Sequence, residues 1–188
     1  MAEVLLFHHV LGLTPGCVAF ADDLRAAGHV VHTPDLFDGR TFATLDEGLA
    51  HARQIGFETM IERGHDVAES LPPGLVYGGW SAGAMSAQSL AQTRPGARGA
   101  VLLHSAIPVT EFSDAWPDGV PLQIHTMEDD ELGDVDVARE LAETIATAEL
   151  FLYPGDRHLF TDASAPDHDE AATALVKERV LAFLAALD

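Results

Sequence analysis

Ser81 lies at the centre of the pattern in this chain with the clearest chemical meaning, Gly79-x-Ser81-x-Gly83. An apolar run precedes the pattern and a helix-like segment follows it, which is typical of a sharp strand-to-helix turn that exposes a nucleophilic serine. Glycines are expected two residues before and after the serine because such a turn leaves no room for larger side chains. The start of the following helix would favour negative charge on a substrate oxygen. The pattern therefore predicts a serine nucleophile.

A nucleophilic serine needs a base, because a neutral hydroxyl is a weak nucleophile. Four histidines follow Ser81 in the chain. His104 and His125 end predicted strands and are interpreted as packed side chains, and His168 is interpreted as solvated. His158 lies in a loop shortly before the last predicted helix, where the chain order serine, acid, histidine of the α/β-hydrolases places the base. We therefore predict that His158 accepts the serine proton.

The base in turn needs a carboxylate that fixes its tautomer and stabilises its cation. Four consecutive acidic residues, Glu128 to Glu131, follow the predicted strand at 122–126. A run of this kind is usually a solvated loop, but it stands at a strand end, where a partner for His158 is required. Asp130 is our first choice and Asp129 the second. Physical reasoning from the sequence leaves both open.

The developing oxyanion needs two amide donors. One is expected to be the backbone N–H of Ala82, directly after the nucleophile. The other should come from the loop that follows the first predicted strand, and Val10 is our choice there. Because backbone donors do not depend on the side chain, this choice is geometric.

Four further residues are candidates for contact with a substrate: His9, Arg40, Trp80 and Phe160. His9 could line the pocket or bond to backbone at a strand end. Arg40 could receive an anionic group or form a surface ion pair. Trp80 is a candidate pocket wall because it adjoins the nucleophile, and Phe160 is either pocket wall or core.

Alternating strands and helices are expected to position these residues. The predicted strands cover residues 4–8, 29–33, 75–78, 99–104, 122–126 and 149–153. The predicted helices cover residues 15–27, 45–55, 57–70, 82–92, 135–147 and 171–187, with Thr14, Thr44 and Asp134 as caps. This alternation indicates an α/β fold with a mostly parallel sheet of six to seven strands, covered by helices on both faces. The candidate residues follow strand ends, where sites form in such sheets.

Composition restricts the class of protein and its partners. At 188 residues, the chain predicts a single domain over 1–188, and no apolar run is long enough to span a membrane. The first residues lack the positive start of a signal peptide, so a cytoplasmic location is expected. The net charge of −20 disfavours nucleic acid and anionic membranes as partners, and it opposes anionic substrates unless local cations offset it. With one cysteine, Cys17, we expect no disulfide and no structural zinc site. The serine mechanism needs no metal and no cofactor, and none is expected.

Taken together, these residues resemble the dienelactone hydrolase family of α/β-hydrolases. The similarity includes the loop at 9–13, the segment Pro34-Asp35-Leu36-Phe37, the Ser81 turn, the Asp130 loop and the segment 155–160. Family members are compact and have no large lid, and the short connection 105–119 agrees with this. Members with dienelactone activity typically carry a cysteine nucleophile and a glutamate after the first strand, where this chain has Ser81 and His9.

The resemblance implies hydrolysis of a small carboxylic ester, lactone or thioester through an acyl-enzyme. As a separate expectation, the protein is a monomer or small homo-oligomer with a small-molecule substrate. The two departures mean that a cyclic dienelactone is not carried over as the substrate. One alternative is a general carboxylesterase or thioesterase for longer acyl chains. The other is a non-catalytic protein that uses the same fold to bind a ligand.

Overall fold

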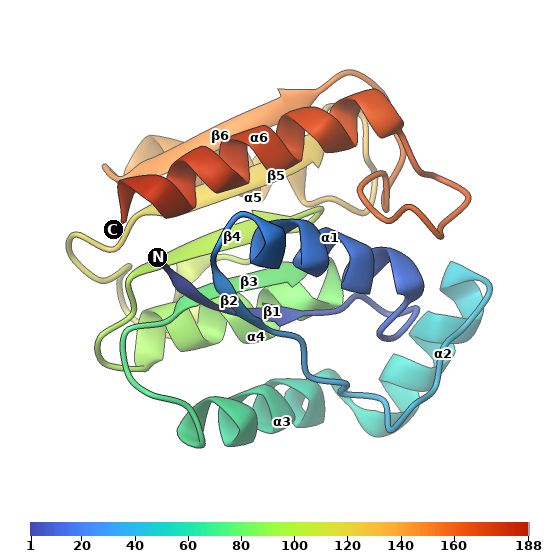
Figure 1. The fold of residues 1–188 in the computed structure, drawn as a ribbon, viewed down its shortest axis with the longest axis horizontal. Coiled ribbons are helices and arrows are strands. Elements are labelled where there is room, and N and C mark those ends of the chain that lie inside the picture. Colours follow the sequence, from blue (N-terminus) through green and yellow to red (C-terminus); the bar gives the residue numbers. More distant parts are fainter. Residues whose placement is uncertain (188) are drawn as a thin grey trace.

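Six parallel strands form one sheet in the order β2-β1-β3-β4-β5-β6 in this computed structural model, which describes residues 1–187 (Figure 1). The strands are β1 (Glu3–Phe7), β2 (Val30–His32), β3 (Val76–Trp80), β4 (Gly99–Leu103), β5 (Leu122–Met127) and β6 (Ala148–Tyr153). Every neighbouring pair runs parallel. The predicted α/β fold is therefore confirmed, with six strands and no antiparallel member among the described residues.

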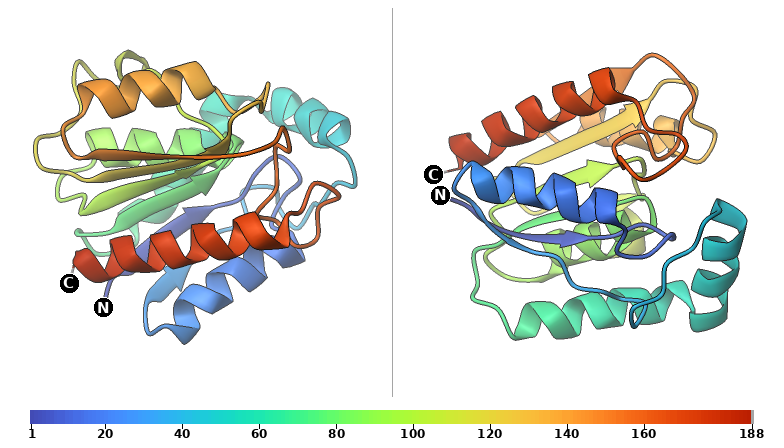
Figure 2. Two further views of the ribbon diagram at one scale, coloured as in Figure 1. Left: turned by 90° about the horizontal axis from the view of Figure 1, so that it is seen from above. Right: turned by 45° about the vertical axis from the view of Figure 1, so that its right-hand side comes forward.

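Helices cover both faces of the sheet, as the views in Figures 1 and 2 agree. On one face lie α1 (Pro15–Ala26) and α6 (Glu170–Ala186), and on the other lie α3 (Phe57–Glu69), α4 (Ala82–Thr93) and α5 (Val135–Thr144). Helix α2 (Leu45–Ile55) lies beyond the carboxyl ends of the strands. In residues 1–187, no helix is both long enough and apolar enough to cross a membrane.

The sheet divides the core into two layers. Strand β1 contributes side chains to both layers, which explains why the sequence of β1 is apolar throughout. Alternate side chains of a strand point to opposite faces. Leu5 and Phe7 therefore pack in the layer beneath α3 and α4, while Val4 and Leu6 pack in the layer beneath α1 and α6. A strand that is buried on both faces needs an unbroken apolar run.

The predicted helix caps are confirmed at two of three positions. The side chains of Thr14 and Thr44 accept hydrogen bonds from backbone N–H groups of α1 and α2. Asp134 was expected to cap the fifth helix, but its side chain makes no capping bond and its backbone is left-handed, with φ 50° and ψ 42°. That helix ends at Thr144, before the predicted 147, because the Thr147 carbonyl turns to accept the N–H of Leu122 at the start of β5.

Candidate active site

The turn from β3 into α4 holds Ser81 in a strained backbone conformation, with φ 49° and ψ −116°. Its N–H is fixed by a 2.7 Å hydrogen bond to the Leu103 carbonyl. A Cβ atom on Gly79 would overlap the carbonyl of Gly83, and a Cβ atom on Gly83 would overlap the carbonyl of Phe7. Both glycines are therefore required by the close passage of β1, β3 and α4.

A chain of two short hydrogen bonds connects Ser81, His158 and Asp130. Ser81 Oγ lies 2.7 Å from His158 Nε2, and His158 Nδ1 lies 2.8 Å from Asp130 Oδ2. His158 and Asp130 are each 5% exposed. Because the serine and the carboxylate use opposite ring nitrogens, the imidazole can take the hydroxyl proton while its other N–H stays bonded to the carboxylate.

The loop after β5 brings Asp130, and not Asp129, to the histidine. Asp129 is exposed, and its N–H is bound to the Gly155 carbonyl. The Leu132 N–H donates to the other Asp130 oxygen at 2.9 Å, which orients the carboxylate. Gly133 packs so closely that a Cβ atom there would overlap the Asp130 side chain. Of the two candidates for the acid, Asp130 is the one in hydrogen-bond contact with His158.

Two amides are available beside Ser81. Val10 follows β1, Ala82 begins α4, and both line the cavity that contains the serine. Within residues 1–187, neither backbone N–H donates to a protein acceptor. Helix α2 supports the Val10 loop from behind, because a Cβ atom on Gly48 would overlap the Val10 carbonyl.

A cavity of about 180 Å³ opens in front of the serine. This is room for about six waters at roughly 30 Å³ each, so the cavity suits a small ligand. Its apolar wall comes from α2, α3, α4 and the Asp130 loop: Leu45, Leu49, Phe57, Met85 and Leu132. The remaining lining residues are Val10, Ser81, Ala82, Ser105, Asp134 and His158.

Sequence reasoning missed most of this wall, although one signal was present. Leu45 and Leu49 are four residues apart, so they share one face of the predicted second helix. Asp134 was read only as a helix cap. Instead, it lines the cavity and its Oδ2 accepts a 2.9 Å hydrogen bond from Ser105.

Two aromatic residues expected at the substrate do not line this cavity. Trp80 is 1% exposed, packs edge-on against Phe20 of α1, and donates its ring N–H to Thr161. Its side chain points to the face opposite α4, because it adjoins Ser81 at the end of a strand whose residues alternate in direction. Phe160 is fully buried against His104. Both are core residues, so their prediction as pocket walls is wrong for this cavity.

His9 and Arg40 also lie outside the cavity. His9 is fully buried, with Nε2 at 2.8 Å from Asp162 Oδ2 and Nδ1 accepting from the Leu11 N–H at 3.2 Å. Arg40 is exposed and does not line the cavity. The prediction that these residues contact substrate is therefore not supported by their positions. Of the two alternatives for His9, a histidine bonded to backbone at a strand end agrees better with its hydrogen bond from Leu11.

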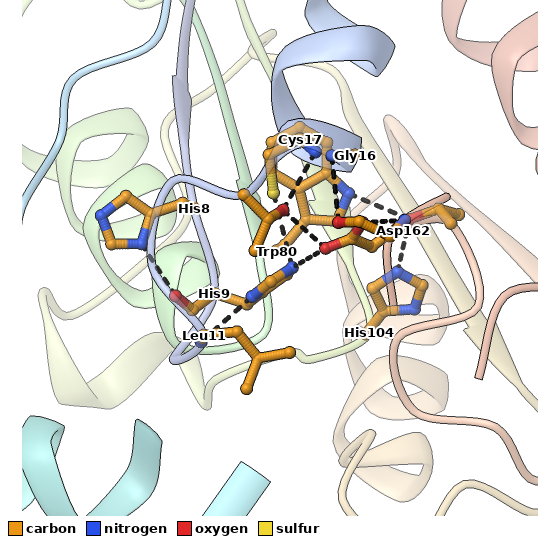
Figure 3. Close-up of polar contacts among 11 residues, drawn as sticks. His8, His9, Leu11, Gly16, Cys17, Trp80, His104 and Asp162 are labelled. Carbon is orange, nitrogen blue, oxygen red and sulfur yellow. Dashed lines mark hydrogen bonds and ion pairs between the residues drawn. The ribbon is translucent and has the colours of Figure 1, made fainter. Parts of the chain in front are cut away.

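The His9–Asp162 pair belongs to a buried network beneath the site (Figure 3). Asp162 also accepts from Thr14 Oγ1 at 2.6 Å and from Ser164, and Cys17 Sγ lies 3.4 Å from His9 Nε2. Burial alone would raise the pKa of Asp162, but these hydrogen bonds lower it well below its usual range. The network ties the Val10 loop to the loop that carries His158.

His9, Cys17 and Asp162 bring three potential metal-ligand atoms within 4.8 Å of one another. The thiol of Cys17 and the carboxylate of Asp162 both face Nε2 of His9. In a catalytic relay, the nucleophile and the carboxylate contact different ring nitrogens, so this group lacks that arrangement. The hydrogen bonds already satisfy the histidine and the aspartate. We therefore assign the group neither a metal nor a second reaction.

Three further buried histidines are held neutral. Burial lowers the pKa of His8 to about 4 and that of His125 to about 3. Burial, with the nearby His158, lowers the pKa of His104 well below its usual range. His104 bonds to Thr161 through Nε2 at 2.7 Å, while its Nδ1 has no hydrogen-bond partner in the described chain. The expectation that His104 and His125 are packed side chains agrees with their complete burial.

Comparison with known proteins gives one family match and many similar folds. Residues 1–187 match the dienelactone hydrolase family. A proposed dienelactone hydrolase from Klebsiella pneumoniae is 17% identical with a TM-score of 0.77, over 98% of this chain and 87% of that one. A dienelactone hydrolase from Anabaena variabilis is 16% identical with a TM-score of 0.71, over 99% of this chain and 86% of that one.

A third structure shares the fold with a different stated activity. It is a dienelactone hydrolase-like promiscuous phosphotriesterase from metagenomic libraries, 16% identical with a TM-score of 0.77, over 100% of this chain and 87% of that one. At these identities, the three structures establish the fold alone. No curated protein matches the chain at a significant level.

Proposed function

Because this chain belongs to the dienelactone hydrolase family and a hydrolytic function follows from that, we propose that it is a serine hydrolase that cleaves small carboxylic esters, lactones or thioesters. The observation that carries the proposal is the hydrogen-bonded series Ser81, His158 and Asp130, in which the serine and the carboxylate contact opposite nitrogens of one ring. The strained backbone of Ser81 supports it, since such strain is retained at functional turns.

In the proposed acylation, Ser81 Oγ attacks the carbonyl carbon of the substrate while its proton passes to His158 Nε2. Asp130 keeps the Nδ1 proton in its hydrogen bond and stabilises the imidazolium. The carbonyl oxygen becomes an oxyanion and is held by the N–H groups of Val10 and Ala82. A single donor of this kind is worth about 10²–10³ in rate. His158 then protonates the departing alcohol or thiol, which leaves an acyl-serine.

In the proposed deacylation, water takes the place of the leaving group. His158 Nε2 accepts a proton from this water as its oxygen attacks the acyl carbon, and the same two amides hold the second oxyanion. The proton then returns to Ser81 Oγ as the C–O bond breaks, which releases the acid and regenerates the enzyme. Every proton is exchanged among the substrate, water and residues of this chain.

The size of the cavity supports small substrates over long acyl chains. At about 180 Å³ it lies below the 300–1,000 Å³ of typical ligand sites, and its apolar wall is short. A series of p-nitrophenyl esters tests this. We expect kcat/KM to fall at least about tenfold from butyrate to octanoate, which corresponds to a loss of about 1.4 kcal/mol or more in transition-state binding.

Ser81→Ala provides the control, and it should reduce hydrolysis of the butyrate ester by about 10³-fold or more while the fold is retained. A flat or rising chain-length profile would instead favour the longer-chain esterase or thioesterase. Folded wild-type protein without hydrolytic activity on any of the esters, or activity that survives Ser81→Ala, would favour a ligand-binding protein that does not use this serine.

A further inference from the structure

We propose that the active-site cavity selects esters and thioesters that carry a positive charge over those that carry a carboxylate, and that Asp134 is the selecting residue. The inference rests on the proposed function, because it concerns the substrate of the same site.

The charged residues that line the cavity support this preference. Besides His158 of the relay, Asp134 is the one charged residue among those that line it. The chain has ten lysines and arginines, all within the described residues, and none of them lines the cavity. A carboxylate on a substrate would therefore find no cation to pair with, while an ammonium group would find a carboxylate.

Asp134 is held at the cavity by its neighbours. It lies between the Asp130 loop and α5, with a left-handed backbone that aspartate and asparagine adopt more readily than most residues. The hydroxyl of Ser105, which follows β4, donates to Asp134 Oδ2 at 2.9 Å. Asp134 Oδ1 has no hydrogen-bond donor among residues 1–187, so this oxygen can receive a group of the substrate.

A hollow next to the cavity is acidic as well. A second hollow shares Leu45, Leu132 and His158 with the cavity. Its other lining residues are all carboxylates: Asp129, Asp130, Glu131, Asp156 and Asp167. With a net charge of −20 on the whole chain, the field at this hollow attracts cations and repels anions.

Arg139 of α5 and Arg157 beside the relay histidine do not reverse this field locally. Arg139 pairs with Asp136 on the surface of α5, at 3.1 Å. Arg157 adjoins the relay histidine in sequence, but its guanidinium bonds to the His168 carbonyl and lies 3.6 Å from Asp169. Both cations are thus engaged outside the cavity, and the acidic character of the site is preserved.

Two matched series of thioesters test the inference, one with the charge on the thiol and one with it on the acyl group. The first compares acetylthiocholine, 3,3-dimethylbutyl thioacetate and the thioacetate of 3-mercaptopropanoate. The second compares ethyl thioesters of 4-trimethylammoniobutanoate, 5,5-dimethylhexanoate and glutarate. Each set has a cation, a neutral compound of the same shape and a carboxylate. Release of thiol gives kcat/KM for all six.

We expect the cation to exceed the carboxylate by about tenfold in at least one series, since a charge pair with the exposed Asp134 contributes modestly and the two substrates differ in sign. Asp134→Asn keeps the backbone preference and the acceptor for Ser105, and it should lower this ratio about threefold to fivefold. Asp136→Asn removes one charge two residues farther along the chain, at a side chain that is 98% exposed, and it should leave the ratio unchanged.

The outcomes separate the two proposals. If wild-type protein hydrolyses the neutral thioesters but treats carboxylates as well as cations in both series, the serine hydrolase stands and the charge selection is overturned. An equal effect of Asp134→Asn and Asp136→Asn overturns the role of Asp134. If none of the six thioesters is hydrolysed although p-nitrophenyl esters are, the serine hydrolase stands and the charge selection is overturned. If neither the thioesters nor the p-nitrophenyl esters are hydrolysed, the proposed function fails and the selection falls with it.

Discussion

At the scale of single residues, the decisive contacts are the two that His158 makes with its ring nitrogens. The 2.8 Å hydrogen bond to Asp130 keeps the proton on Nδ1 of His158. The 2.7 Å contact with Ser81 requires Nε2 to be unprotonated, so that it can accept the serine proton. An imidazole in the wrong tautomer would present a proton to the hydroxyl and could not accept one. The account therefore depends on the identity of the acid.

Replacing the acid tests this dependence. Asp130→Asn preserves shape but can bond the wrong tautomer, so kcat should fall about 10³–10⁴-fold. Asp129→Asn, which changes an exposed neighbour in the same loop, should stay within about threefold of wild type, as surface substitutions usually do. Steady-state kinetics on a p-nitrophenyl ester would measure both. The opposite ranking of the two variants would show that Asp129 is the acid.

At the scale of elements, the site depends on how closely α2 approaches the loop after β1. Gly48 lies directly behind the Val10 carbonyl, where no Cβ atom fits. Alanine normally stabilises a helix by about 1 kcal/mol relative to glycine. At this position the added methyl group must instead displace Val10, whose N–H is a proposed oxyanion donor.

Gly48→Ala should therefore lower kcat about tenfold or more, the effect of misplacing one donor, with a smaller change in KM. Ala50→Gly, at an exposed position of the same helix, weakens the helix by about 1 kcal/mol without touching Val10, and its kcat should be normal. Kinetics and thermal unfolding of both variants provide the comparison. A normal kcat for Gly48→Ala would remove Val10 from the mechanism.

The elements were largely predictable because each has a local cause. Thr14 and Thr44 mark helix starts through hydrogen bonds to groups three residues away, and the apolar run of β1 reflects burial on both faces. The lining of the cavity was not predictable from the sequence, because it depends on where α2 and α3 dock. The His9–Asp162 pair joins residues 153 positions apart, and neither residue carries a local sign of the other.

The candidate site also divides into residues with a local sequence signal and residues without one. The glycines around Ser81 and the order of acid and histidine selected three residues that the structure brings within hydrogen-bond reach. Trp80 was misplaced because adjacency in sequence was taken for adjacency in space, although alternate strand residues face opposite layers. Asp134 was misread because a side chain before a helix usually caps it, and only the folded backbone shows otherwise.

At the scale of the whole molecule, buried neutral histidines link stability to pH. Burial lowers the pKa of His8 to about 4 and that of His125 to about 3, and the pKa of His104 is lowered as well. In the unfolded chain these groups titrate near 6.5. Between these values each of these three histidines binds more protons in the unfolded chain, so their contribution to the free energy of unfolding decreases as the pH falls. His9 acts in the opposite direction, because burial would lower its pKa but the hydrogen bond to Asp162 raises it to about 9.

We expect the free energy of unfolding to decrease from pH 7.5 to pH 4.5 by about 2 kcal/mol for each of His8 and His125, with a further decrease from His104 and a smaller opposite contribution from His9. Urea unfolding at both pH values, in about 0.5 M NaCl to screen the repulsion among surface carboxylates, would measure the change. A free energy of unfolding that is constant or increases toward pH 4.5 would mean that these histidines accept protons within the fold.

The most direct test of the account is to ask whether Ser81 becomes covalently modified in the folded protein. A fluorophosphonate probe reacts with a serine whose proton is removed by a neighbouring base. The account predicts one phosphonyl group per chain, located on the peptide that contains Ser81 by mass spectrometry, and none in Ser81→Ala. Folded wild-type protein that hydrolyses esters but carries the label on another residue, or carries none, would contradict it.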